Sequence, residues 1–300
     1  LTPSGLNYVD RLIEGFLYFK MAEGLSDSTL VNYKRAIELM VDRLNVQDFN
    51  TLISSDLTRH LVWLKTEYRP KRKGFDPKPL SGKTVRNHWV ALKSFFRWLN
   101  LEINVPNLMD RVPPPKFDFP PITPLKESDI KALLQECKFK RKADTFRRRP
   151  FHMRRPTAVR DEAAILVLLD TGLRASEFCA LNIGDLDLKT GRLGVKHGKE
   201  GGAKGGVGRA VFIGRKTRRA VWKYLSHRED AEFPESPLFV STIYSRMTPN
   251  SLRHVIKSLA NKAGIEKCYP HLFRHTFAIT YLRSGGDVLT LQAILGHKSL

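Results

Sequence analysis

The chain has 300 residues, and its 42% hydrophobic content is enough to bury an ordinary core in one or two domains. Its 51 lysines and arginines outnumber its 30 acidic residues, and the formal charge of +21 indicates a polyanionic partner such as nucleic acid. The three cysteines lie too far apart in the sequence for a disulfide framework or a zinc site. No apolar run is long enough for a membrane span or a signal peptide. Both observations favour a cytoplasmic protein with reduced thiols.

The first hundred residues have the pattern of a helical module. Apolar residues recur at steps of three and four over residues 30–44 and 85–99, with candidate N-caps at Ser26–Ser28 and Ser81. Two more helices are expected over Tyr8–Met21 and Asp56–Tyr68. We therefore predict four short helices with basic faces over residues 1–111.

A basic segment separates two of these helices. Its cations, together with two on the following helix, are expected to contact DNA phosphates, which attract lysine and arginine whatever the base sequence. These candidates are Arg69, Lys71, Arg72, Lys73, Lys83 and Arg86. A solvated loop without a partner explains the composition of the segment 69–74 equally well.

Prolines dominate residues 112–124, which can form neither a helix nor a central strand and are predicted to be a semi-rigid linker. Residues 125–300 are predicted to be mainly α with a small antiparallel β-sheet. Ser128 is expected to cap their first helix, and the run Lys138–Arg155 has little periodicity and is predicted to be a basic loop. The remaining predicted elements are helices over Asp161–Asp170, Lys216–Ser226, Asn250–Ala263, His271–Ser284 and Val288–Leu295, and strands over Arg192–Lys196 and Arg209–Ile213.

The segment Thr171–Glu177 reads Thr-Gly-Leu-Arg-Ala-Ser-Glu. Gly172 is expected to end one helix, and Glu177 to lie in the first turn of the next. Arg174 is then held in a tight turn, where its guanidinium can make a two-pronged contact to phosphate oxygens. A surface arginine at a helix start is the ordinary alternative.

The loop between the two predicted strands opens with Gly198 and Lys199. A lysine at a hairpin tip can be presented to a bound nucleic-acid backbone, and Lys204 competes for this role. The loop lacks the spacing of a nucleotide-binding P-loop.

The segment His271–His275 reads His-Leu-Phe-Arg-His at the start of a helix. His271 and Arg274 are three residues apart and share a face, whereas Leu272 and Phe273 are expected to point into the core. The two histidines are four apart, but leucine stands where a zinc protease motif has glutamate, so we predict no metal. A buried structural histidine is the alternative to a functional His271.

Gly296 is expected to end the last helix and to leave His297 at its exposed tip. The four motifs in this order resemble the tyrosine recombinase, or phage integrase, family, including Xer-like and transposon integrases. The whole chain also resembles the two-part plan of that family. Residues 1–111 would be a helical, SAM-like core-binding domain, 112–124 the linker and 125–300 the catalytic domain.

The resemblance implies a site that transfers a phosphoryl group without metal or cofactor. Arg174 and Arg274 would clamp the non-bridging oxygens of the scissile phosphate and stabilise its pentacoordinate transition state. Glu177 would orient the neighbouring basic residues. A phosphotyrosine bond at the DNA 3′ end would store the bond energy, so that ATP is not required.

Three further residues would complete the site. Lys199 would protonate the departing 5′-hydroxyl, His271 would act as general acid and base for the tyrosine hydroxyl, and His297 would donate a hydrogen bond to the phosphate.

The family pattern places the nucleophilic tyrosine shortly after the Gly–His pair, beyond Leu300. Tyr269 and Tyr281 do not fit this pattern, and Tyr224 and Tyr244 are expected to be packing residues. The chain starts with leucine rather than methionine and stops within a helical pattern, so both ends are expected to be cut ends.

The expected function is site-specific DNA recombination, in integration, resolution or transposition of a mobile element. Double-stranded DNA is the expected partner, with a homo-tetramer on DNA and a monomer without it. The alternatives are a non-cleaving DNA-binding protein of the same fold and an enzyme similar to type IB topoisomerases. A basic RNA-binding protein would explain the charge but not the four motifs.

Overall fold

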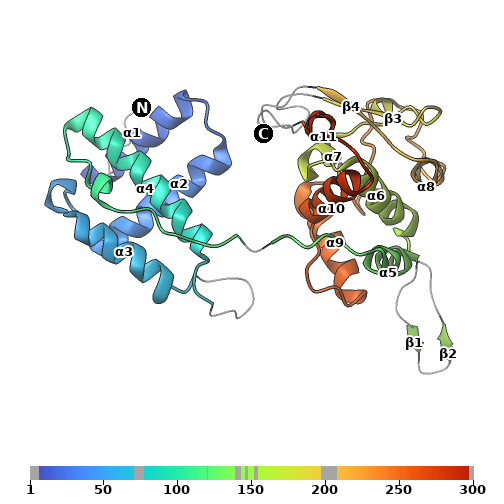
Figure 1. Cartoon of the computed structure of the whole chain (residues 1–300), viewed down its shortest axis with the longest axis horizontal. Helices are drawn as coiled ribbons and strands as arrows, with labels where there is room; N and C mark the ends of the chain where they lie inside the picture. Colours follow the sequence, from blue (N-terminus) through green and yellow to red (C-terminus); the bar gives the residue numbers. More distant parts are fainter. Residues whose placement is uncertain are drawn as a thin grey trace. The chain divides into compact units, whose positions relative to one another are not determined.

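The structure is a computed structural model that describes residues 7–70, 78–119, 121–138, 155–196 and 208–296, and the backbone alone of 143–145 and 148–151. The chain divides into two compact units, Leu1–Pro120 and Pro121–Leu300 (Figure 1). Each unit has its own buried core. The boundary falls inside the proline-rich segment 112–124.

The first unit contains the four helices that the sequence predicts. They are α1 (Tyr8–Ala22), α2 (Asp27–Leu44), α3 (Ser54–Thr66) and α4 (Gly82–Ile103), with the short 3-10 turns η1 (Phe49–Thr51) and η2 (Leu108–Arg111). The hydroxyl of Ser81 accepts a hydrogen bond from the Thr84 N–H and caps α4 as expected. Helix α4 packs against the other three, as Figure 1 shows.

Aromatic rings fill the centre of this unit. Phe16 of α1 packs edge-on against Phe95 of α4, with ring centroids 5.2 Å apart, and Phe95 packs in the same way against Phe49, at 5.3 Å. All three rings are fully buried. Because such pairs combine a large buried area with a favourable edge-to-face geometry, they hold α1, η1 and α4 together.

A histidine is buried in this core beside Trp63, with ring centroids 5.8 Å apart. His60 of α3 is fully buried, and neither ring nitrogen has a hydrogen-bond partner among the described residues. Burial, with smaller contributions from the charges of Arg43 and His88, lowers the pKa of His60 from 6.5 to about 3. The folded unit therefore holds the imidazole neutral.

Acid is expected to destabilise the first unit through His60. The unfolded chain binds a proton there near pH 6.5, whereas the folded chain resists protonation down to about pH 3. The contribution to stability is thus complete above pH 6.5 and declines below it, at a slope of up to about 1.4 kcal/mol per pH unit. His60→Leu should reduce this slope in urea unfolding followed by tryptophan fluorescence, and the remainder comes in part from His88, whose pKa burial also lowers. Replacing the exposed His254 with asparagine should leave the slope as it is. An unchanged slope in His60→Leu would contradict the assignment.

The second unit is mainly helical. Its helices are α5 (Glu127–Lys138), α6 (Ala158–Thr171), α7 (Ala175–Ala180), α8 (Arg215–Leu225), α9 (Pro249–Lys262), α10 (Pro270–Arg283) and α11 (Val288–Leu295), with the 3-10 turn η3 (Ile183–Asp185). Strands β3 (Arg192–Val195) and β4 (Arg209–Phe212) pair antiparallel, with Leu193 opposite Val211. The expected fold class, mainly α with a small antiparallel sheet, is confirmed. Among the described residues, no helix is both long and apolar enough to cross a membrane.

Three sequence predictions for this unit are wrong. The run Lys138–Arg155 was expected to be a loop throughout, but it contains the antiparallel strands β1 (Ala143–Thr145) and β2 (Arg148–Phe151). These strands are too short to show an alternating pattern in the sequence. Helix α5 begins at Glu127, so Ser128 lies inside its first turn and is not the cap. Tyr244, expected to pack, is 83% exposed at a left-handed backbone position (φ 57°), whereas Tyr224 is buried as predicted.

Candidate functional site

The turn between α6 and α7 has the expected form. Gly172 follows α6 in the left-handed region (φ 59°), and a Cβ atom there would lie 2.6 Å from the ring of Phe277, so only glycine fits. Arg174 occupies the N-cap of α7 with extended backbone, and its N–H donates to the carboxylate of Glu177 at 2.9 Å. This local hydrogen bond fixes the backbone of Arg174 and so the direction in which its side chain extends from the turn.

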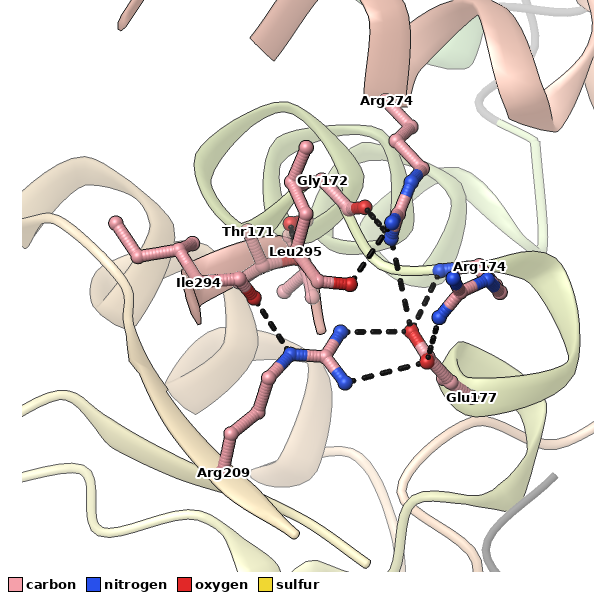
Figure 2. Close-up of polar contacts among 9 residues, drawn as sticks. Thr171, Gly172, Arg174, Glu177, Arg209, Arg274, Ile294 and Leu295 are labelled. Carbon is pink, nitrogen blue, oxygen red and sulfur yellow. Dashed lines mark hydrogen bonds and ion pairs between the residues drawn. The ribbon is translucent and has the colours of Figure 1, made fainter. Parts of the chain in front are cut away.

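Glu177 is the centre of a cluster of charged side chains (Figure 2). Its side chain is fully buried, and its carboxylate accepts from Nη1 of Arg174 at 2.8 Å and from Nη2 of Arg209 at 2.9 Å. The two arginines approach from opposite sides. Burial alone would raise the pKa of Glu177, but hydrogen bonds from Arg209 and from the backbone and side chain of Arg174 lower it below its ordinary value. The carboxylate is therefore ionised.

Arg274 reaches the same cluster from α10. Its side chain is 4% exposed, and its guanidinium donates to two backbone carbonyls, Gly172 O at 3.0 Å and Leu295 O at 2.8 Å. Its Nη1 lies 4.0 Å from the Glu177 carboxylate. Burial, and then the positive charge of Arg174, lower the pKa of Arg274 to about 10, so it remains cationic at neutral pH. Leu272 and Phe273 point into the core as predicted.

Arg209 is a member of this cluster that sequence reasoning missed. It begins β4, its side chain is 9% exposed, and it donates through both terminal nitrogens to Glu177. The strand pattern carried a usable signal, because Arg209 shares a face with the buried Val211. A cation on the apolar face of a strand needs a buried anionic partner, but the sequence does not indicate which carboxylate this is.

Of the other predicted site residues, the structure describes His271 but not the remaining ones. His271 is exposed at the start of α10, with its ring centroid 4.6 Å from that of His275, so the buried structural alternative is wrong. Among the described residues, no group of three His, Cys, Asp or Glu could hold a metal ion. The predicted site residues Lys199, Lys204 and His297 lie outside the described residues.

Some of the residues of the first unit that were predicted to contact DNA are described by the structure, and others are not. Lys71, Arg72 and Lys73 lie outside the described residues. Arg69 and Lys83 are exposed, and the guanidinium of Arg86 lies 5.0 Å from the centre of the Trp89 ring. Lys83 and Arg86 both belong to the first turns of α4.

The cluster has the chemistry of a site for an anion. The guanidiniums of Arg174, Arg209 and Arg274 surround the single carboxylate of Glu177, which leaves positive charge in excess. The side chain of Arg174 is 32% exposed and can reach a ligand. Guanidiniums bind the oxygens of phosphate through paired N–H donors, so the arrangement suits a phosphate group.

Comparisons with known proteins show which family the chain resembles. The model of the phage integrase family matches residues 124–300, and the model of the N-terminal SAM-like domain of phage integrases matches residues 13–102. The chain is 29% identical to tyrosine recombinase XerA of Saccharolobus solfataricus, over 96% of this chain and 85% of the relative. It is 28% identical to tyrosine recombinase XerC of Bacillus subtilis, over 98% of this chain and 89% of the relative.

Solved structures have a similar fold. The Tn1549 transposon integrase in complex with transposon right end DNA aligns with a TM-score of 0.72 at 20% identity, over 97% of this chain and 92% of that chain. A lambda integrase dimer bound to a core site aligns with a TM-score of 0.69 at 16% identity, over 97% of this chain and 95% of that chain. The family model covers more than half of the chain. With its two matched domains, the chain belongs to the phage integrase family.

Proposed function

We propose that the chain is a tyrosine recombinase that cuts and rejoins duplex DNA at specific sites through a 3′-phosphotyrosine intermediate. One observation supports this function above the others. Arg174 and Arg274, which lie far apart in the sequence, reach the same buried carboxylate, Glu177. A paired guanidinium site in a chain of this family is suited to an in-line attack on a DNA phosphate.

The two arginines would act mainly in the transition state. Attack on the phosphate adds negative charge to its non-bridging oxygens, and donors that are already in place stabilise that charge without reorganising. The guanidinium of Arg274 is held by two carbonyls and shielded from water, which strengthens its interaction with an anion. Arg174 is more exposed and would meet the phosphate from the solvent side.

Proton transfer would fall to residues around this clamp. His271 lies on the same face of α10 as Arg274, one turn earlier, and would exchange a proton with the tyrosine hydroxyl. Lys199 would act as the acid for the 5′-hydroxyl, and His297 would donate a hydrogen bond to the phosphate. The nucleophile would be a tyrosine, and none of the tyrosines in the sequence is assigned this role.

The chemical step is tested by covalent trapping. The full gene product is incubated with a nicked suicide substrate, from which the cleaved strand cannot be rejoined. A covalent adduct of the protein with the 3′-phosphate is the expected product. Binding to the site without an adduct would favour the non-cleaving alternative, and an absence of binding to duplex DNA would overturn both.

The first unit would contribute to DNA affinity through α4. Because each phosphate contact releases counterions, the double variant Lys83→Ala/Arg86→Ala should lower the slope of log affinity against log salt by about one per lost contact. The cleavage rate of the saturated complex should stay unchanged. Lys34→Ala is the control, since Glu38 already balances that charge at 3.7 Å. An equal slope in both variants would show that Lys83 and Arg86 of α4 do not contact DNA phosphates.

The DNA-bound form would be a homo-tetramer that joins two sites, with a monomer in the absence of DNA. We place its action in the cytoplasm, where DNA of a mobile element or a chromosome is accessible. Sedimentation with and without a duplex site tests the assembly. A tetramer in the absence of DNA would contradict it.

A further inference from the structure

Arg209 connects three segments that are distant in the sequence. Its Nε donates to the carbonyl of Ile294 at 2.5 Å, and its Nη1 and Nη2 donate to the two oxygens of Glu177 at 3.2 and 2.9 Å (Figure 2). It thereby links the start of β4 to α7 and to the end of α11. A planar guanidinium can satisfy all three acceptors at once, whereas an ammonium group has no such fork.

The end of α11 is shared between two arginines. Arg209 binds the carbonyl of Ile294, and Arg274 binds the carbonyl of the next residue, Leu295. These carbonyls lie at the negative end of the helix, which favours cations. The position of Arg274 is therefore linked, through one turn of α11, to the position of Arg209.

Glu177 makes a second link between Arg209 and the two arginines proposed to bind the phosphate, Arg174 and Arg274. Its carboxylate accepts from Arg174 and Arg209 and lies 4.0 Å from Arg274. Without the two donors of Arg209, this buried charge would lack its main partner and would attract Arg274 or Arg174 more strongly. An arginine that binds Glu177 more tightly is less able to bind the scissile phosphate.

We infer that Arg209 is a positioning residue of the recombination site. It saturates Glu177 and holds the end of α11, so that Arg174 and Arg274 stay directed at the scissile phosphate. This inference rests on the proposed function. Arg209 itself does not have to touch DNA.

Gly296 offers an independent way to test this role. It follows α11 in the left-handed region (φ 65°), and a Cβ atom there would lie 2.9 Å from Nη1 and 3.3 Å from Cζ of Arg209. Gly296→Ala should therefore displace the guanidinium without changing its chemistry. Gly264 has a similar φ of 70° with no atom within 4 Å of its Cβ position, so Gly264→Ala carries the same backbone strain without this contact.

Arg160 provides the matched control for Arg209. It is also buried, and it donates to a carboxylate, that of Asp161, and to a backbone carbonyl, that of Val240. None of these groups belongs to the cluster around Glu177. A purely structural role for Arg209 predicts that Arg209→Lys and Arg160→Lys behave alike.

The experiment measures single-turnover cleavage of a nicked suicide substrate by the full gene product, together with DNA affinity and melting temperature. Arg209→Lys should slow cleavage by about ten- to a hundredfold, because misplacing a catalytic group by about 1 Å has an effect of this size. DNA affinity should be unchanged. Gly296→Ala should be slowed similarly, whereas Arg160→Lys and Gly264→Ala should cleave at the rate of the unchanged protein.

A substrate with a neutral methylphosphonate at the scissile position gives a further readout. Replacing one anionic oxygen lowers the need for guanidinium charge, so the defect of Arg209→Lys should shrink on this substrate. A defect in folding alone would be equal on both substrates and would overturn the inference, as would equal cleavage by Arg209→Lys and Arg160→Lys. If the unchanged protein forms no adduct, the proposed function fails and the inference fails with it.

Discussion

Arg274→Ala is expected to slow DNA cleavage by at least about a thousandfold, because arginines that stabilise a phosphoryl transition state contribute on this scale. DNA affinity should change by less than about threefold, since most protein–DNA contacts are made to other phosphates. Single-turnover trapping on a nicked substrate measures the first quantity, and equilibrium binding to the intact site measures the second.

Two further variants sharpen this prediction. Arg274→Lys keeps the charge but cannot bind the carbonyls of Gly172 and Leu295 and a phosphate with one planar group, so it should recover only a small part of the rate. Arg283→Ala removes an exposed arginine from the last turn of the same helix and should leave cleavage unchanged. If Arg274→Ala lost binding and cleavage in equal measure, Arg274 would act in affinity and not in the transition state.

Glu177→Gln is expected to reduce both stability and cleavage. Glu177 is buried between Arg174 and Arg209, and removing its charge leaves these guanidiniums without their anionic partner. Breaking a buried ion pair by removing one partner costs about 3 kcal/mol or more. Urea unfolding should register this loss. Cleavage should fall further than the folded fraction, because the freed arginines repel one another at the site.

The dependence of stability on pH gives a second readout of the same variant. The pKa of Glu177 in the folded chain lies below its ordinary value of 4.5. The contribution of Glu177 is therefore complete above about pH 4.5 and is lost as the pH falls toward the lower folded value. Glu177→Gln should lack this acid-dependent loss, and Glu235→Gln, at an exposed position, should retain it. An identical acid profile in both variants would contradict the assignment.

The local parts of the site could be predicted because short-range rules govern them. Gly172 and Gly296 both take the left-handed conformation that ends a helix, and Arg174 and Glu177 meet across the first turn of α7. His271 and Arg274 share a helix face by periodicity alone. Each of these statements needs only a few consecutive residues.

The long-range parts could not be predicted in this way. Nothing near Arg209 in the sequence indicates that it binds Glu177 and the carbonyl of Ile294, because that contact depends on how β4 packs beside α7 and α11. The strands β1 and β2 are likewise too short to show an alternating pattern. The polar residues Thr58 and Arg59 directly before His60 in the sequence give no sign that its ring is buried.

The sequence by itself determined the helical fold class, the family and the two arginines, since periodicity, capping and motif order are properties of short segments. Only the tertiary structure decided that Arg174, Arg209 and Arg274 surround one buried carboxylate. The physical reason is that a buried charge must find its partner in space, and the chain can supply that partner from any distance along its length.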